Sequence, residues 1–373
     1  MRIEPSVPED VLARVRAPFE GFGAKRVDAP LLQPLNLLLD LAGEAMRSRL
    51  FVVQAEGGSE SCLRPDFTVA IAQQHIAAAR SDGRYLYQGP AFRAAAGTDR
   101  PEEFVQVGLE VFGEDGPAAD AQIAGLAWQS AQAGGRQDLS LWLGDVALFA
   151  AFIATLEMPP ALAARLRRVA GRPRLLAAEL DRVDQSAPQG EGVLAGLLTG
   201  LSEAQSAALL QEVWALAGVE PVGGRGAAEI AARLIRKAEA ASAPALTRAQ
   251  ADAIGAFMSI DATPRSAFAE VRSLAGRNAD KLKSVLAAWD QRLTALVRTV
   301  PEAVMHFTPA LGHAFDYYDG VTFEVRSAAL GTGLPVAVGG RYDGLLTRLG
   351  ASGAPHAVGC MVRPWRAWAG GQS

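Results

Sequence analysis

The chain has 373 residues, half of them hydrophobic and 20% charged, with 36 basic against 40 acidic side chains. A net charge of −4 and a pI near 5.7 exclude a general cationic surface for a nucleic-acid backbone. Two cysteines and four histidines without metal-ligand spacing exclude a disulfide framework and predict no metal site. No stretch has the pattern of a membrane span or a signal peptide, so we expect a cytoplasmic globular protein that does not contact a membrane.

The composition divides the chain into three zones. Residues 1–157 and 301–373 carry short β-type runs and glycine clusters, whereas 158–300 is rich in alanine and leucine with helical periodicity. Capping boxes at 202–205 and 247–250, and Thr263 before Pro264, mark helix starts in the middle zone. We therefore predict a core in two parts and a helical insertion over 158–300 that packs without a catalytic role.

The clearest strand signal is the alternation over 103–112, which follows another β-type run over 85–88 across a polar loop. Together these runs predict an antiparallel pair. One face of the second run carries Gln106, Gly108 and Glu110, a polar notch suited to a small cationic or donor-rich ligand. A solvated strand face explains the same alternation, so both interpretations stay open here.

Later in the chain, a strand is predicted over 321–326, directly after the adjacent tyrosines Tyr317 and Tyr318. Because neighbouring residues of an extended chain point to opposite sides, one tyrosine can pack in the core while the other lines a pocket. The apolar run 336–338 leads into a glycine-arginine loop at 339–344 and a helix at 345. Such a loop lets a ligand approach backbone N–H groups, but its spacing is not that of a P-loop.

Seven segments, taken in order, resemble the catalytic core of class II aminoacyl-tRNA synthetases, and of histidyl-tRNA synthetase in particular. They are Pro30–Pro34, Leu63–Thr68, Gly89–Arg93, Gln106–Gly113, Phe315–Gly320, Gly339–Leu345, and Ala357–Gly359 with Arg366 behind it. The resemblance implies an α+β fold with a six-stranded antiparallel sheet flanked by helices. It also implies a homodimer formed through the region around Pro30.

The resemblance further implies a histidine-binding site. In that family, the positions matching Asp66 and Gln106 hold the α-amino group of histidine, although the first is a glutamate there. The position matching Arg93 holds the carboxylate or the α-phosphate of the adenylate. The imidazole is read by the positions matching Glu110 and one of the two tyrosines. Arginines at further nucleotide-handling positions are candidate remnants of a nucleotide site, namely Arg341 and Arg366.

Three departures from the synthetase pattern predict that adenylation is lost. Ala95 replaces the glutamate that grips adenine, His313 replaces a charge-stabilising arginine, and Trp365 replaces the glutamate before the final arginine. Losing one well-placed electrostatic donor typically costs about 2.7–4 kcal/mol of transition-state stabilisation. The sequence ends soon after the last match, so no anticodon-binding domain and no tRNA binding are expected.

These losses give the chain a closer resemblance to the family of ATP phosphoribosyltransferase regulatory subunits. This resemblance implies a non-catalytic partner, without a cofactor, that activates the short-form catalytic subunit in the first step of L-histidine biosynthesis. It also implies feedback inhibition by L-histidine in a hetero-oligomer, for which a hetero-octamer is one candidate. The alternative is a truncated histidyl-tRNA synthetase-like enzyme that adenylates an amino acid for a non-tRNA acceptor.

Overall fold

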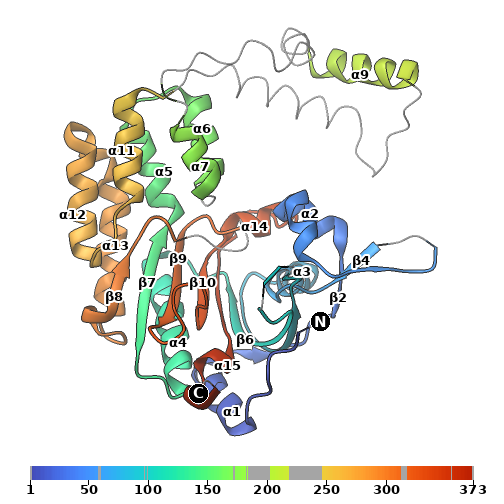
Figure 1. Ribbon diagram of the computed structural model, residues 1–373, viewed down its shortest axis with the longest axis vertical. Helices are drawn as coiled ribbons and strands as arrows, with labels where there is room; N and C mark the ends of the chain where they lie inside the picture. Colours follow the sequence, from blue (N-terminus) through green and yellow to red (C-terminus); the bar gives the residue numbers. More distant parts are fainter. Residues whose placement is uncertain are drawn as a thin grey trace. The chain divides into compact units, whose positions relative to one another are not determined.

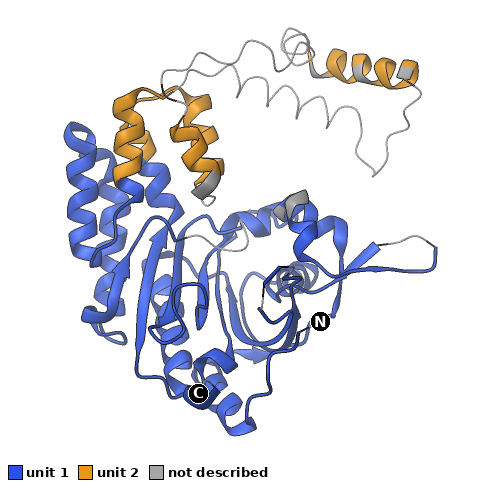
Figure 2. Cartoon of the chain, in the orientation of Figure 1, with its two compact units in different colours: residues 1–152, 257–373 blue, residues 153–256 orange. Residues whose placement is uncertain are grey.

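The structure is a computed structural model that describes residues 2–57, 60–95, 97–98, 100–170, 173–181, 183, 202–217, 246–311, 317–353 and 355–371. The chain forms two compact units, 1–152 with 257–373, and 153–256 (Figure 2). Helices α12 (Pro264–Ala275) and α13 (Lys283–Leu296), which we expected within the 158–300 insertion, belong to the first unit. None of the described helices is both long and apolar enough to cross a membrane.

The first unit contains a large sheet, which has eight strands in the described part of the chain rather than the six expected (Figure 1). Its order is β1-β5-β6-β11-β10-β9-β7-β8. The six inner strands are all antiparallel, and the short parallel strands β1 and β8 extend the two edges. Strands of two and three residues are too short to show an alternation, which is why the sequence did not predict them. The bounds are β1 Lys25–Arg26, β5 Gly83–Phe92, β6 Glu103–Phe112, β7 Leu139–Asp145, β8 Met305–Phe307, β9 Val321–Ser327, β10 Ala337–Arg341 and β11 Ala357–Val362.

The antiparallel pair predicted from the alternation is confirmed as β5 and β6, ten residues each, with Gly89 opposite Gln106 and Tyr85 opposite Glu110. The predicted strand over 321–326 is confirmed as β9. A second, three-stranded antiparallel sheet has the order β2-β4-β3, with bounds Leu32–Pro34, Glu60–Leu63 and Val52–Gln54.

Helices cover the large sheet. Helices α1 and α4 contact the inner strands β6, β10 and β11 among others. A separate apolar cluster joins α3 and α14 to Tyr87 of β5 and Phe112 of β6. Strand β6 is therefore buried along nearly its whole length. The helices of the first unit include α1 Glu9–Gly21, α2 Leu35–Ala42, α3 Thr68–Ala77, α4 Gly116–Ala133, α14 Asp343–Arg348 and α15 Pro364–Ala367, and α5 Val146–Thr155 begins there.

The predicted helix starts are confirmed. Ser202 and Gln205 form a reciprocal capping box of 3.3 and 2.9 Å before α9 (Glu203–Ala217), and Thr247 and Gln250 form one of 3.2 and 3.1 Å before α11 (Arg248–Met258). Pro264 is the first residue of α12, as expected. The remaining described helices of the second unit are α6 Pro160–Val169 and α7 Pro173–Leu180.

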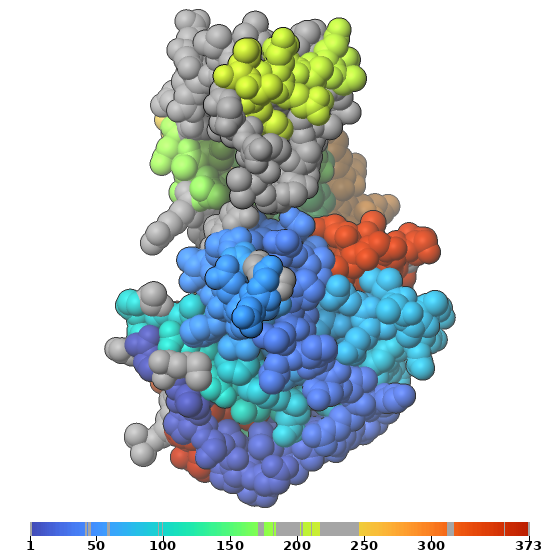
Figure 3. Space-filling view, turned by 90° about the vertical axis from the view of Figure 1, so that its right-hand side faces the viewer, coloured from blue at the N-terminus to red at the C-terminus, as the bar shows by residue number. Residues whose placement is uncertain are grey.

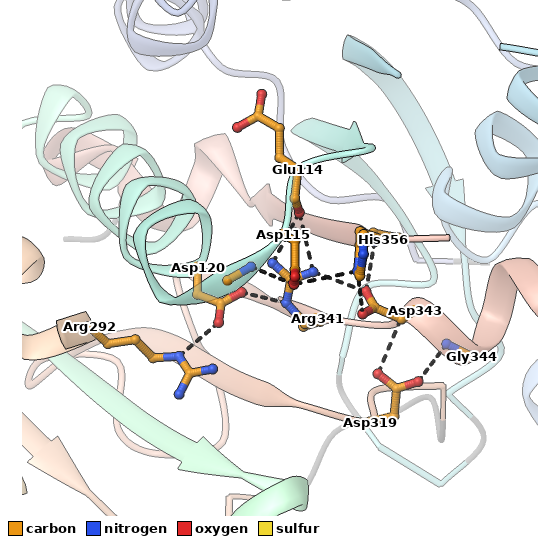
Figure 4. Close-up of polar contacts among 11 residues, drawn as sticks. Glu114, Asp115, Asp120, Arg292, Asp319, Arg341, Asp343, Gly344 and His356 are labelled. Carbon is orange, nitrogen blue, oxygen red and sulfur yellow. Dashed lines mark hydrogen bonds and ion pairs between the residues drawn. The ribbon is translucent and has the colours of Figure 1, made fainter. Parts of the chain in front are cut away.

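An ion cluster ties two helices to the large sheet (Figure 4). Asp120 of α4, only 1% exposed, accepts hydrogen bonds from Arg341 Nε of β10 and Arg292 Nε of α13, both at 2.7 Å. Arg341 also donates to Asp343 at 3.0 Å. One buried carboxylate thus compensates two arginines, and removing it leaves them with their charges incompletely paired.

We expect Asp120→Ala to lower the free energy of unfolding by about 3–5 kcal/mol, because it breaks a buried ion pair from one side. Urea titration measures the change. The matched control is Asp290→Ala on α13, an exposed carboxylate, which should change the free energy by less than about 0.5 kcal/mol. Equal effects of the two substitutions would contradict the assigned role of the cluster.

Candidate functional site

A cavity of about 270 Å³ opens in the first unit. Six of the eight residues predicted as binding residues line it: Asp66, Arg93, Glu110, Tyr317, Tyr318 and Arg366. They come from the loop before α3, the ends of β5 and β6, the segment before β9, and α15. Gln106 lies fully buried on β6 but is not part of the lining. Arg341 lies in the ion cluster around Asp120 instead (Figure 4).

Glu110 is the most enclosed acid of this cavity, with 1% of its surface exposed. Thr68 Oγ1 donates a hydrogen bond to Glu110 Oε1 at 2.7 Å, and the Tyr342 hydroxyl donates to Oε2. Gly359 on the neighbouring strand makes room, because a Cβ there would overlap the carboxylate. Burial raises the pKa of Glu110 to about 8, against the lowering effect of these two hydrogen bonds. At neutral pH the carboxyl group of Glu110 is therefore mostly protonated.

The polar face of β6 is not solvated, so that interpretation is wrong. Gln106 and Glu110 are 0% and 1% exposed, because α3 and the residues around Tyr342 cover this face. The notch expected at Gly108 is filled by the ring of Tyr87, which would overlap a Cβ at that position. Tyr87 stacks in turn on Phe67 with 4.3 Å between ring centroids. The face therefore forms the floor of an internal site.

Two side chains of this region keep unused hydrogen-bonding capacity. Both carboxylate oxygens of Asp66, and both the oxygen and the nitrogen of the Gln106 amide, are buried without a hydrogen-bond partner in the described part of the chain. Burial raises the pKa of Asp66. The positive charge of Arg93, the backbone N–H groups of Thr68 and Val69 and the Tyr317 hydroxyl oppose this, although none of these donors reaches full hydrogen-bond geometry. Leaving such groups unpaired costs about 1–3 kcal/mol each, which a donor-rich ligand would recover.

The adjacent tyrosines close another side of the cavity. The ring centroids of Tyr317 and Tyr318 lie 5.7 and 6.3 Å from that of Tyr342. Burial raises the pKa of both hydroxyls, so they remain neutral phenols that can donate and accept. Asp319 fixes their segment by accepting hydrogen bonds from the backbone N–H groups of Asp343 (3.1 Å) and Gly344 (2.6 Å) at the start of α14 (Figure 4).

The three residues that replace synthetase residues lie in different parts of the chain. Ala95 lines a neighbouring cavity that contains several arginines. Trp365 packs edge-on against Trp368, with 5.5 Å between ring centroids. His313 lies outside the described residues. Cys62 and Cys360 are buried free thiols, and no group of side chains suited to a metal ion occurs among the residues that the structure describes.

Sequence reasoning missed several residues of the site. Thr68 and Tyr342 hold the carboxyl group of Glu110 but lie 42 and 232 residues from it, and nothing local to either residue indicates the contact. Arginines Arg49, Arg100 and Arg363 also line the cavity. For Arg363 the sequence did contain a local signal. It directly follows the apolar run of β11, and an arginine so close to a buried strand is unusual.

Comparisons with known proteins identify the family of the chain. The sequence model of the family "Histidyl-tRNA synthetase" matches residues 6–222 and 225–364. An ATP phosphoribosyltransferase regulatory subunit from Brucella anthropi is 34% identical over 359 residues, covering 94% of both chains. The protein of the same name from Rhizobium meliloti is 35% identical over 373 residues, covering 95% of this chain and 94% of its own.

Solved structures show the same fold. An ATP phosphoribosyltransferase regulatory subunit/histidyl-tRNA synthetase from Bacillus halodurans has a TM-score of 0.68 at 19% identity, covering 100% of this chain and 83% of that one. Histidyl-tRNA synthetase from Nostoc has a TM-score of 0.60 at 16% identity, covering 98% and 74%. The fold is thus that of a class II synthetase-like protein. The chain belongs to the histidyl-tRNA synthetase family and, within it, to the ATP phosphoribosyltransferase regulatory subunits.

We expect Glu110→Gln to stabilise the protein increasingly as the pH rises. The unfolded chain loses the Glu110 proton near pH 4.5, whereas the folded chain keeps it to about pH 8, so wild-type stability falls between these values. The glutamine variant has no ionisable group at this position, so its stability does not fall in this way. Its advantage in free energy of unfolding should grow by about 3–5 kcal/mol between pH 4 and pH 8.5.

Urea titrations across this range measure the difference. Glu56→Gln, at an exposed position, is the control and should follow the wild-type pH profile. Parallel profiles for Glu110→Gln and the wild type would show that Glu110 ionises normally in the folded chain.

Proposed function

We propose that this chain is a cytoplasmic, non-catalytic regulatory subunit that activates the short-form catalytic subunit of ATP phosphoribosyltransferase in the first step of L-histidine biosynthesis. We further propose that it takes part in feedback inhibition by binding L-histidine in the cavity around Glu110. The observation that carries the binding proposal is the set of buried, unpartnered polar atoms on Asp66 and Gln106 beside a protonated Glu110.

The chemistry of free histidine suits this set. Its ammonium group offers three donors to the buried carboxylate of Asp66, which lines the cavity. Its carboxylate can pair with the Arg93 guanidinium, which is part of the lining. Its imidazole can exchange a proton with Glu110 and hydrogen-bond to Tyr317 or Tyr318. Because each charge-assisted hydrogen bond contributes about 1.5–3 kcal/mol, loss of one should be measurable.

The alternative, an enzyme that adenylates an amino acid for a non-tRNA acceptor, draws support from Arg93 and Arg366, which both line the cavity. Against it stands Ala95, which carries no carboxylate at the position where the synthetases grip adenine. The names of the curated relatives also favour the regulatory role. We therefore keep adenylation as the second candidate, to be tested by histidine-dependent exchange between ATP and pyrophosphate.

We expect phosphoribosyl-ATP formation by the separately purified short catalytic chain of the same organism to rise when this protein is added. Histidine should then suppress it. Asp66→Asn should raise the histidine concentration for half-inhibition at least about tenfold, because it weakens the pairing with the ammonium group. Asp82→Asn, at an exposed position, is the control and should leave that concentration unchanged.

The outcomes separate the parts of the proposal. No activation of a demonstrably folded cognate catalytic chain would contradict the activating role. Activation that histidine does not suppress, with no histidine binding by calorimetry to the chain or the complex, would contradict the sensing role alone. Histidine-dependent ATP–pyrophosphate exchange would favour the enzymatic alternative.

We also propose that the chain forms a homodimer through the region around Pro30. In Figure 1 the hairpin of β3 and β4 extends away from the large sheet, and in Figure 3 the blue N-terminal segments lie in the centre and lower part of this face. Large apolar side chains of this region are 39–51% exposed: Leu31, Leu32, Val52 and Val53. Clustered exposed apolar side chains are typical of a surface that a second subunit covers.

We expect Leu32→Glu to convert the dimer into a monomer, because the interface would have to bury an unpaired charge. Light scattering coupled to size-exclusion chromatography measures the mass. Ile3→Glu is the matched control, since Ile3 is 64% exposed outside the small sheet, and it should remain dimeric. A wild-type chain that is monomeric at micromolar concentration would contradict the proposal.

A further inference from the structure

A separate cavity, of about 560 Å³, lies where helices α3 and α14 end, and we call it the α3–α14 cavity. None of the residues that line it belongs to the lining of the cavity around Glu110. Each helix is followed by a left-handed residue, Ala79 with φ 50° and Gly350 with φ 94°, so the chain turns away and leaves this space open. The volume is in the range of sites that hold a small organic molecule.

The floor of the α3–α14 cavity is apolar. It is lined by Ile76 of α3, Phe112 at the end of β6 and Leu346 of α14. Phe112 and Leu346 belong to the buried cluster between the helices and the sheet, and Ile76 packs against that cluster. A ligand with an apolar body would remove the remaining exposed part of this floor from water.

The polar side chains of the cavity are basic or neutral, and no carboxylate lines it among the described residues. Arg80 is exposed, and its guanidinium forms no hydrogen bond or ion pair in the part of the chain that the structure describes. The backbone carbonyl groups of Ile76 and Leu346, near the helix ends, already accept hydrogen bonds from backbone N–H groups. The cavity therefore offers donors to an anion and little to a cation.

Two histidines of the lining each keep one ring nitrogen without a hydrogen-bond partner in the described ranges. His75 is only 4% exposed, and its Nδ1 lies 2.9 Å from the Tyr85 hydroxyl. With that hydroxyl as the donor, Nε2 of the neutral ring carries the hydrogen and can donate it to a ligand. The ring of His75 is fixed further by stacking on Phe112, with 4.4 Å between the ring centroids.

His356 is oriented in a similar way on the other side of the cavity. Its Nδ1 lies 3.2 Å from Asp343 and 3.5 Å from Asp115 (Figure 4), so the remaining nitrogen is again Nε2. Burial and the positive charge of Arg80 lower the pKa of His75, with Asp82 acting in the opposite direction. An anion bound beside Arg80 would reduce this effect of its charge.

We propose that the α3–α14 cavity binds a small organic carboxylate with an apolar body. Its carboxylate accepts hydrogen bonds from Arg80 and from Nε2 of His75, and its apolar body lies on Phe112 and Leu346. Such a ligand satisfies a buried ring nitrogen and an unpaired guanidinium at the same time. The inference does not depend on histidine binding around Glu110 or on a catalytic partner.

The first test is calorimetric titration of the full-length chain with benzoate, acetate and the neutral isostere benzamide. Benzoate should bind more tightly than acetate, because its ring covers the apolar floor, and more tightly than benzamide, because it carries the charge. Arg80→Ala should weaken benzoate binding about tenfold. Arg100→Ala is the matched control, since Arg100 is also exposed but lines other cavities, and it should leave benzoate binding unchanged.

The second test locates the ligand by nuclear magnetic resonance of the histidine rings, which number four in the chain and can be assigned by substitution. Benzoate should shift the signals of His75 and His356. The signal of His306, which stacks on Trp142 outside this cavity, should stay in place. The proposal is overturned if acetate or benzamide binds as tightly as benzoate, if Arg100→Ala weakens binding as much as Arg80→Ala, or if millimolar benzoate leaves the His75 signal unchanged.

Discussion

The site depends on one buried carboxyl group. Glu110 lies buried near the end of an inner strand, where an acid is stable only if other groups satisfy its oxygens. Thr68 at the start of α3 and Tyr342 at the end of β10 supply these hydrogen bonds, and Gly359 of β11 leaves the space. Three separate segments are thereby fixed around one residue. The apolar cluster of α3, α14 and the sheet then encloses the cavity that they share.

Much of the fold could be predicted where the signal is local. The ten-residue alternation of β6 and the reciprocal side-chain pairs at Ser202 and Thr247 are properties of neighbouring residues, and the structure contains them as expected. Whether the polar face of β6 was solvated could not be decided in this way. That depends on whether α3 and Tyr342 pack against this face in the folded chain, and both are far from it in the sequence.

The distribution of charge also shows that contacts between residues far apart in the sequence cannot be predicted from local patterns. The overall composition correctly gives an acidic chain, yet it hides an arginine group assembled from positions 49, 93, 100, 363 and 366. These arginines come from three separate segments, so no window along the sequence is unusually basic. Arg341, expected at a nucleotide-handling position, shows the converse, because Asp120 and Asp343 neutralise it within the ion cluster.

The raised pKa of Glu110 has a consequence for the heat of ligand binding. A free imidazole loses its proton near pH 6.5, while Glu110 keeps its proton to about pH 8. On the proposal that this cavity binds histidine, a neutral imidazole that arrives between these pH values would lie beside the Glu110 proton. The proton can move from carboxyl to ring without entering or leaving the solvent. The enthalpy of association in that interval would then be the same in buffers of different ionisation enthalpy, and outside it the buffer would contribute.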